Sequence, residues 1–250
     1  MRFLSENFIN TTTQIKVDSN TATVGNLFDR DKTVTWESSG YGTNTSTIIS
    51  IEFDQSTTIT HIILLNHNLK QFRVFYNSVT ANVLSPDINE TANSATANYY
   101  SFTSVIVNSV QLQMDLAVTD DTENKVGEFI IAQNRLVFTR NPDIRLFKPM
   151  LDRKQVRHIM PDGGVVLYNV KNKYKTKIGL RFITQAFHDS LLSLYEEAVP
   201  LIFAPFPTST SWDGGAFPVV WSGDFDFKFS YNVKDVGFSG NITLEERTSV

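Results

Sequence analysis

One stretch of the chain, residues 173–207, has the spacing of an amphipathic helix held between two strands. Its apolar residues recur at intervals of three and four positions and form one stripe, which consists of Phe187, Leu191, Leu194, Tyr195 and Ala198. We expect Thr184 to cap the start of this helix, and Pro200 to end it because a proline ring cannot continue the hydrogen-bond ladder. Alternating residues before the helix and an apolar run after it predict the order strand, helix, strand.

Elsewhere, short apolar runs separated by turn-forming residues predict β-strands. In the first half these runs have the length of single strands, at residues 48–53, 59–67, 71–76, 99–107, 109–118 and 127–133. Such a series is typical of an antiparallel sandwich or barrel. In the second half, PDGG at residues 161–164 predicts a hairpin turn, and further strands surround the helix. The chain is therefore predicted to be mainly β, with a sandwich followed by an α+β unit that has one main helix.

The distribution of charge supports two domains. A chain of 250 residues is long enough for two cores. Residues 1–139 carry 8 Lys and Arg against 14 Asp and Glu, a net of −6, whereas residues 140–250 carry 14 against 12, a net of +2. Because Pro142 and Pro149 also mark turns near this change of sign, we predict domains at residues 1–139 and 140–250.

Residues 140–181 are the most basic part of the chain, with 11 Lys and Arg against 3 Asp. A local excess of this kind forms a solvated face, a subunit contact or a nucleic-acid contact. The first two interpretations are the more common, so nucleic acid is not the expected partner.

The composition excludes several classes of chemistry. The chain has no cysteine, and so it has no disulfide, no thiolate nucleophile and no cysteine-ligated zinc. No apolar run approaches the roughly 18 residues that cross a bilayer, so we expect no membrane span. Polar sequence follows closely after Met1, so we expect no signal peptide and synthesis in a bacterial cytoplasm.

Three segments of the first half resemble parts of discoidin domains, which are also called coagulation factor type C domains. NLFDRDKTVTW (residues 26–36) resembles the opening motif of that family, residues 48–66 resemble its core strand pair, and KVGEFII (residues 125–131) resembles its closing strand. The segments stand in the order of the family and span about half the chain. The resemblance implies a jelly-roll sandwich over residues 1–139, as in galactose-binding and other carbohydrate-binding modules.

The second half resembles the tail-tube-like fold of bacteriophage tail and baseplate proteins. The likeness lies in its layout: the strand, helix, strand unit, then a loop, then WSGDFDFKFSYNVKDVGFSGNITLEE (residues 221–246), which resembles the closing hairpin of distal or minor tail proteins. This resemblance implies an assembly domain over residues 140–250, with the helix as a packing element.

The discoidin-like resemblance implies a structural calcium site. Relatives of these modules hold the ion with the opening aspartates and the closing glutamate, which correspond here to Asp29, Asp31, Thr33 and Glu128. Calcium binds about six to eight oxygens, and a loop with alternating acids supplies several. The alternative is that Asp29 and Asp31 are turn residues whose side chains bond the local backbone.

The same resemblance implies a glycan site among loops at one end of the sandwich. Candidates by position are Tyr41, His67, Asn68 and Arg73. The alternative interpretation, surface polar residues and a satisfied histidine, is the more common one. Trp36 is expected beneath the sandwich.

No catalytic residues are predicted, and we do not expect an enzyme. The chain lacks a nucleophile elbow and a phosphate-binding loop. Asp224 and Asp226 share one side of a predicted strand, which leaves a glycoside hydrolase as a remote third hypothesis.

The leading hypothesis is a virion structural protein of a phage-like tail or injection particle. In it the second domain forms a homo-oligomeric ring with other tail or baseplate proteins as partners, and the sandwich points outward. The alternative is a carbohydrate-binding protein that recognises a cell-surface glycan. The sequence predicts no cofactor beyond the candidate calcium.

Overall fold

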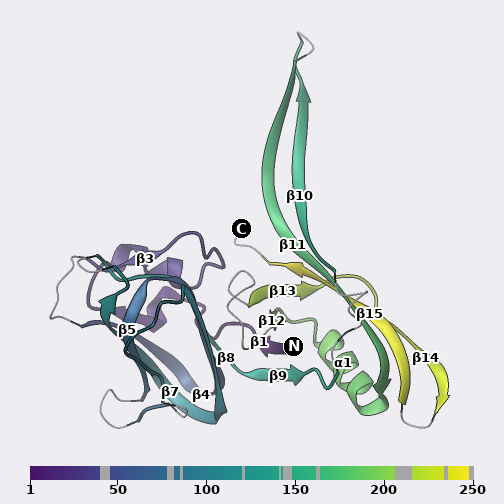
Figure 1. Cartoon of the computed structure of the whole chain (residues 1–250), viewed down its shortest axis with the longest axis horizontal. Helices are drawn as coiled ribbons and strands as arrows, with labels where there is room; N and C mark the ends of the chain where they lie inside the picture. Colours follow the sequence, from purple (N-terminus) through teal and green to yellow (C-terminus); the bar gives the residue numbers. More distant parts are fainter. Residues whose placement is uncertain are drawn as a thin grey trace. The chain divides into compact units, whose positions relative to one another are not determined.

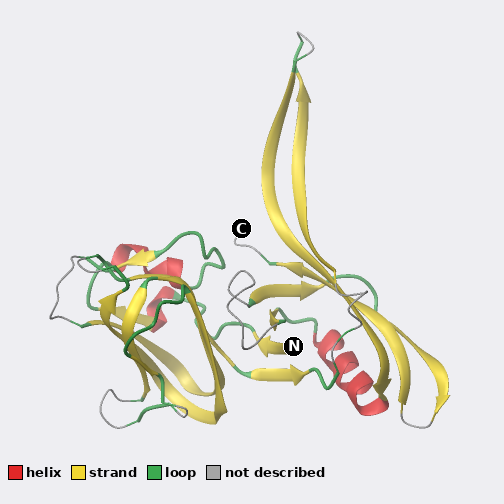
Figure 2. Ribbon diagram, viewed as in Figure 1, coloured by secondary structure: helices red, strands yellow, loops and turns green. Residues whose placement is uncertain are grey.

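A computed structural model of the chain describes residues 1–39, 46–77, 82–84, 87–119, 122–140, 142, 148–161, 164–205, 216–233 and 236–247. Strands dominate it and helices are few (Figure 2), and each strand pairing given below is antiparallel. The predicted fold class, mainly β and antiparallel with one main helix, is therefore confirmed. None of the helices in these ranges has the length and apolarity that crossing a bilayer requires.

The chain packs into two compact units. The first comprises Met1–Val137, Ile202–Ala216 and Ser249–Val250, and the second comprises Phe138–Leu201 and Phe217–Thr248. A segment from the second half of the sequence thus packs with the first unit. Since packing does not test independent folding, the domains at residues 1–139 and 140–250 remain a prediction.

The first unit contains most of the short elements and two long strands (Figure 1). Its strands are β1 (Arg2–Ser5), β2 (Ile15–Val17), β3 (Trp36–Glu37), β4 (Thr47–His67), β5 (Leu69–Tyr76), β6 (Asn89–Glu90), β7 (Ala97–Ala117), β8 (Lys125–Ala132), β9 (Asn134–Val137) and β12 (Leu201–Ala204), the last from Ile202 onward. Two 3-10 helices, η1 (Thr12–Gln14) and η2 (Thr21–Leu27), were not predicted from the sequence.

Strands β4 and β7, each of 21 residues, pair along most of their length and build both layers of the sandwich. The register shifts between Glu52 and Thr57, and this irregularity divides β4 into two halves. The first half also pairs with β2, and the second half with β8, while β5 extends the sheet beyond β7. The strands predicted at residues 48–53 and 59–67 are therefore two parts of one strand.

The core of the first unit lies between the two halves of these long strands. Ile49 of the first half and Leu64 of the second half belong to one buried cluster with Phe72 and Phe129. Trp36 is fully buried in the same cluster, as predicted, and donates its indole N–H to Asn20 O at 3.2 Å. Burying large apolar side chains in this way stabilises the fold by about 1.5–3 kcal/mol each.

The β4–β8 layer is buried on its second face as well. Ile63 and Ile130 point to that face and pack with Leu4 of β1 and Ile202 of β12. Strand β1 pairs with β9 and neighbours β12. This layer therefore reads as an unbroken apolar run, because both faces of its strands are covered.

The second unit contains β10 (Lys148–Ile159), β11 (Val165–Thr184), β13 (Phe217–Trp221), β14 (Asp226–Val233), β15 (Val236–Glu246) and the helix α1 (Gln185–Glu197). Strand β15 is central, since it pairs with β11, β13 and β14. Helix α1 packs against β11 and β15. The predicted strand, helix, strand order around α1 is confirmed.

The helix begins and ends as the sequence predicts, with one correction. Thr184 Oγ1 accepts a hydrogen bond from Phe187 N at 3.2 Å, and Leu191 and Leu194 are buried beside Phe187. Ala198 was expected in this stripe. It is instead an exposed residue just past the helix, where its φ of 51° turns the chain away before Pro200.

Strands β10 and β11 form a long two-stranded ribbon, consisting of Lys148–Ile159 and residues 165–174, that stands away from the other strands of its unit (Figure 1). Strand β11 pairs with β15 only from Lys175 onward. Within the described residues, the ribbon is therefore held by its own ladder alone.

Candidate functional site at the loop end of the sandwich

The three segments that resemble a discoidin domain meet at one end of the first unit. Strand β3, which closes the opening motif, pairs with the start of β8 through Trp36 with Val126 and Glu37 with Lys125. The end of β4 pairs with the next part of β8, where Leu65 lies opposite Glu128. Segments far apart in the sequence thus form one local structure.

The opening loop is folded by its own aspartates. Asp29 Oδ1 accepts a hydrogen bond from Asp31 N at 2.8 Å, and Asp31 Oδ1 accepts one from Thr33 N at 3.1 Å. Arg30, between the two acids, has a left-handed backbone with φ of 65°. The turn role that we gave as the alternative for these aspartates is therefore present, and the Oδ2 atoms take no part in it.

Glu128 is the most perturbed acid of this site. Burial raises the pKa of Glu128 to about 8, and the nearby charge of Asp29 raises it further. Its Oε1 is buried with no hydrogen-bond partner in the described structure. A buried carboxylate without full compensation costs stability, so a cation beside it would be bound favourably.

The backbone approaches this carboxylate closely. A Cβ at Gly127 would lie 2.7 Å from Lys32 O, so no side chain fits there. Asn66 Nδ2 donates to the same Lys32 oxygen at 2.6 Å, which fixes the loop on the strand. Carbonyl and carboxylate oxygens are thus concentrated around Gly127 and Glu128.

The donor set suits an oxygen-seeking ion only if the backbone contributes. Among the described residues, no three His, Cys, Asp or Glu side chains gather closely enough to hold a metal by themselves. Asp29, Asp31 and Glu128, with the Thr33 turn, would supply part of a calcium shell, and loop carbonyls would supply the rest.

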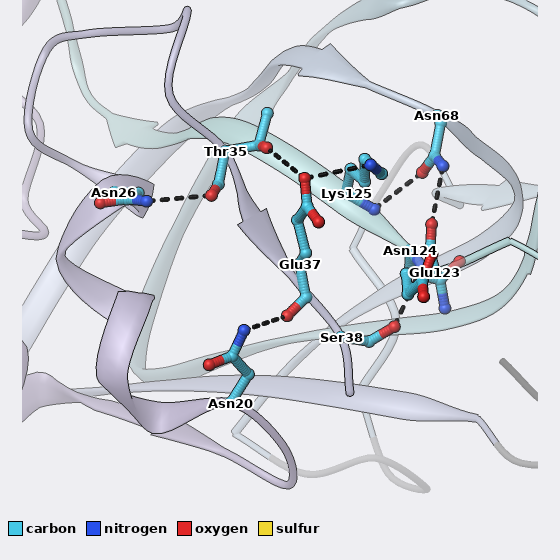
Figure 3. Close-up of polar contacts among 9 residues, drawn as sticks. All are labelled: Asn20, Asn26, Thr35, Glu37, Ser38, Asn68, Glu123, Asn124 and Lys125. Atoms are coloured by element: carbon cyan, nitrogen blue, oxygen red, sulfur yellow. Dashed lines mark hydrogen bonds and ion pairs between the residues drawn. The ribbon is translucent and has the colours of Figure 1, made fainter. Parts of the chain in front are cut away.

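A second network fixes the neighbouring loops (Figure 3). Glu37 lies at its centre, where its Oε1 accepts hydrogen bonds from Lys125 Nζ and Thr35 Oγ1, both at 3.0 Å. The hydrogen bond from Lys125 lowers the pKa of Glu37. Asn20 donates to Glu37 O and Asn26 donates to Thr35 O, so both amides hold backbone. Sequence analysis missed these residues, although short polar side chains in an irregular segment are its one available signal.

Asn68, a predicted glycan ligand, takes part in the same network (Figure 3). Its Oδ1 accepts from Lys125 N at 2.7 Å and its Nδ2 donates to Glu123 O at 2.8 Å. Ser38 and Asn124 are bonded to each other beside it. The amide of Asn68 is therefore used to tie two loops together.

His67, another predicted ligand, is buried next to Asn68. Its Nδ1 accepts a hydrogen bond from Leu69 N at 3.2 Å, and its Nε2 lies 2.7 Å from Asn98 Oδ1, to which it therefore donates. Burial lowers the pKa of His67 to about 4. These contacts correspond to the satisfied histidine that we gave as the alternative.

The other two predicted ligands lie elsewhere. Arg73 is in β5, where its guanidinium lies 3.5 Å from Asp115 Oδ2 and over the Phe75 ring. Tyr41 lies outside the described residues. The structure brings His67 and Asn68 together and separates Arg73 from them, and glycan binding by this set remains a prediction.

Comparison with known proteins gives structural neighbours only. No family model matches the chain, and no curated protein matches it. Solved structures that resemble the chain include CpGH89CBM32-6 produced by Clostridium perfringens (18% identity, 51% of this chain and 99% of that chain, TM-score 0.42). Another is chitosan-binding module 1 of a chitosanase/glucanase from Paenibacillus sp. IK-5 (16% identity, 50% and 97%, TM-score 0.41). A third is a Ruminococcus gnavus GH29 fucosidase in complex with fucose (12% identity, 51% and 26%, TM-score 0.41).

The buried histidine predicts a pH dependence of stability. The folded pKa of His67, about 4, lies below the ordinary 6.5, so its stabilisation is full above pH 6.5 and is lost as the pH falls toward 4. At pH 5 the loss should be about 2 kcal/mol for this residue. His61 has the same shift and retains its own share. In urea unfolding at pH 7.5 and 5, His67→Gln should therefore lose about 2 kcal/mol less than the native chain; equal losses would contradict the assignment.

Proposed function

We propose that this chain is a non-catalytic binding protein whose first unit recognises a carbohydrate. The observation that carries the proposal is the meeting of residues 26–36 with residues 125–131 around buried Trp36 and Glu128. This is the arrangement that the resemblance to discoidin-like carbohydrate-binding modules implies.

The solved neighbours give sugars for a test. Their structures are described as a chitosan-binding module in complex with chitotriose, a fucosidase in complex with fucose, and CpGH89CBM32-5 in complex with GalNAc-β-1,3-galactose. Each sugar should be titrated into the whole chain by calorimetry, with calcium and with EDTA. We expect saturable binding of at least one, and no binding of any of the three would overturn the proposal.

Calcium is proposed as a structural part of this unit. Asp29, Asp31 and Glu128 would hold it with backbone oxygens of the loop near Thr33. The buried and unpartnered Glu128 Oε1 supports this, because the ion would replace the missing partner. The ion would fix the loop and take no part in chemistry.

Thermal unfolding tests the calcium proposal. Calcium at about ten times its Kd should stabilise the native chain by about 1.4 kcal/mol, a rise in Tm of about 3–6 °C. Glu128→Gln should abolish this rise while melting no lower than the native chain in EDTA, because it removes a buried acid. Glu37→Gln is the matched control and should keep the rise. A native Tm that calcium leaves unchanged would exclude the site.

A second candidate function, subunit of a phage-like tail or baseplate, is favoured by the ribbon. Near its end the ribbon exposes apolar side chains on both faces. Ile159 and Val165 lie opposite each other on one face, and Val156 and Tyr168 on the other. Their exposed fractions are 69%, 47%, 40% and 57%, respectively. Leu167 adds to the first face with 58%.

A two-stranded ribbon of this kind needs a partner. Isolated hairpins are at best marginally stable in water, and contiguous exposed apolar surface marks an interaction site. Residues 148–177 carry 8 Lys and Arg against 2 Asp, whereas residues 1–139 have a net charge of −6. Other copies of this chain therefore offer a surface of opposite charge.

In this second candidate the ribbon would join copies into a homo-oligomeric ring within a virion tail or injection particle. The tail-tube-like layout of residues 140–250 supports the same reading. It is compatible with a sandwich that recognises a cell-surface glycan, since one unit would assemble and the other would bind.

Light scattering after size exclusion tests the assembly role. The native chain should form oligomers that Leu167→Glu dissociates, because a charge would replace an apolar contact. Ile106→Glu is the matched control, since Ile106 is an equally exposed apolar residue of the first unit, at 68%. A native chain that stays monomeric as its concentration rises would overturn the assembly role.

A further inference from the structure

We propose that the carbohydrate binds on the outer face of the β4–β7–β5 sheet, around Arg73, Gln113 and Asp115. This inference rests on the proposed carbohydrate recognition and gives it a site. Arg73 was a sequence candidate, but the structure puts it on this sheet face and not with His67 and Asn68.

The pairing of the strands sets out the face in rows. Ser50, Gln111 and Phe75 lie opposite one another on β4, β7 and β5, and Ile48, Gln113 and Arg73 form the next row. Alternate residues of the same strands, such as Leu112 and Val74, are fully buried in the core. The rows therefore point outward, away from the sandwich core.

Hydrogen bonds lock these side chains in fixed orientations. Gln113 Nε2 donates to Ser46 Oγ at 2.9 Å and to Asp115 Oδ1 at 3.3 Å, and Ser46 Oγ donates to Asp115 Oδ1 at 2.5 Å. Arg73 NH2 donates to Asp115 Oδ2 at 3.5 Å. A carboxylate, an amide and a guanidinium thus meet in one preorganised group.

This group has hydrogen-bonding capacity left over. A guanidinium has five N–H donors, and in the described part of the chain Arg73 uses one, on Asp115. Gln113 Oε1 accepts no hydrogen bond from a described residue. The face therefore presents a donor and an acceptor close together and held still.

That pairing is what a sugar requires. Each hydroxyl both donates and accepts, so neighbouring hydroxyls are best bound by fixed, planar groups that offer donors and acceptors together. Asp115 and Arg73 also provide charge-assisted bonds, which are the stronger kind.

The same sheet contains an ordinary solvent-facing pair for comparison. Lys16 lies opposite Ser50 and pairs with Glu52 at 2.6 Å, with side-chain exposures of 66% and 54%. Arg73 and Asp115 are less exposed, at 41% and 28%. Two atoms of the rows, Arg73 Nε and Gln111 Oε1, are also buried without a partner in the described structure. Such groups lower stability, which is unexpected for a face that only meets solvent.

The experiment is an NMR titration of the whole chain with the same three sugars, in which side-chain amide signals report the site. Binding should shift the signals of Gln111 and Gln113 and leave those of Asn68 and Asn124 in place. Arg73→Lys, which keeps the charge but loses the planar fork, and Asp115→Asn should each weaken binding about tenfold or more. Lys16→Ala is the matched control and should bind as the native chain does.

The outcomes separate the site from the function. A sugar that binds with unchanged affinity to Arg73→Lys and Asp115→Asn, and that shifts Asn68 and Asn124 instead, overturns the sheet-face site and leaves carbohydrate recognition standing. Failure of all three sugars to bind the native chain overturns carbohydrate recognition and the site with it. Circular dichroism melting of each variant confirms that weaker binding does not come from unfolding.

Discussion

The two-sided burial of the β4–β8 layer is the constraint on which the first unit depends. Leu64 and Phe129 face the sandwich core, while Ile63 and Ile130 face β1 and β12. A shift of either strand by one residue would exchange these faces, so the register is strongly specified. Everything attached to the start of β8 inherits that register, including the paired β3, the opening loop and Glu128.

The same constraint divides the polar groups of the unit into two kinds. Those near the start of β8 are spent on structure, since Asn68 ties loops together, His67 is enclosed, and Glu128 is buried. Those on the outer face of β5 and β7 have no layer above them and keep donors and acceptors available. A rigid frame that leaves one polar face open is the arrangement on which a recognition surface can be built without disturbing the core.

Sequence patterns predicted the local structure well and the tertiary use of polar residues poorly. Helix α1 was predictable because its stripe, its Thr184 cap and Pro200 all indicate the same limits. Strand β4 was predicted as two strands because Asp54, Gln55 and Ser56 interrupt its apolar pattern, yet the ladder with β7 continues past the irregularity. The roles of His67 and Asn68 could not be predicted, because burial and backbone partners arise from segments distant in sequence. The meeting of the opening and closing motifs was predictable only through the order of their resemblance.

Strand β11 has a mechanical consequence. It is one unbroken strand that forms half of the ribbon, then joins β15, and then ends at Thr184, the cap of α1. A load applied to the end of the ribbon would therefore pass through continuous backbone into the sheet and the helix, with no hinge loop to absorb it. The ribbon behaves as a lever arm fixed to its unit, and whatever grips its end also sets the orientation of α1.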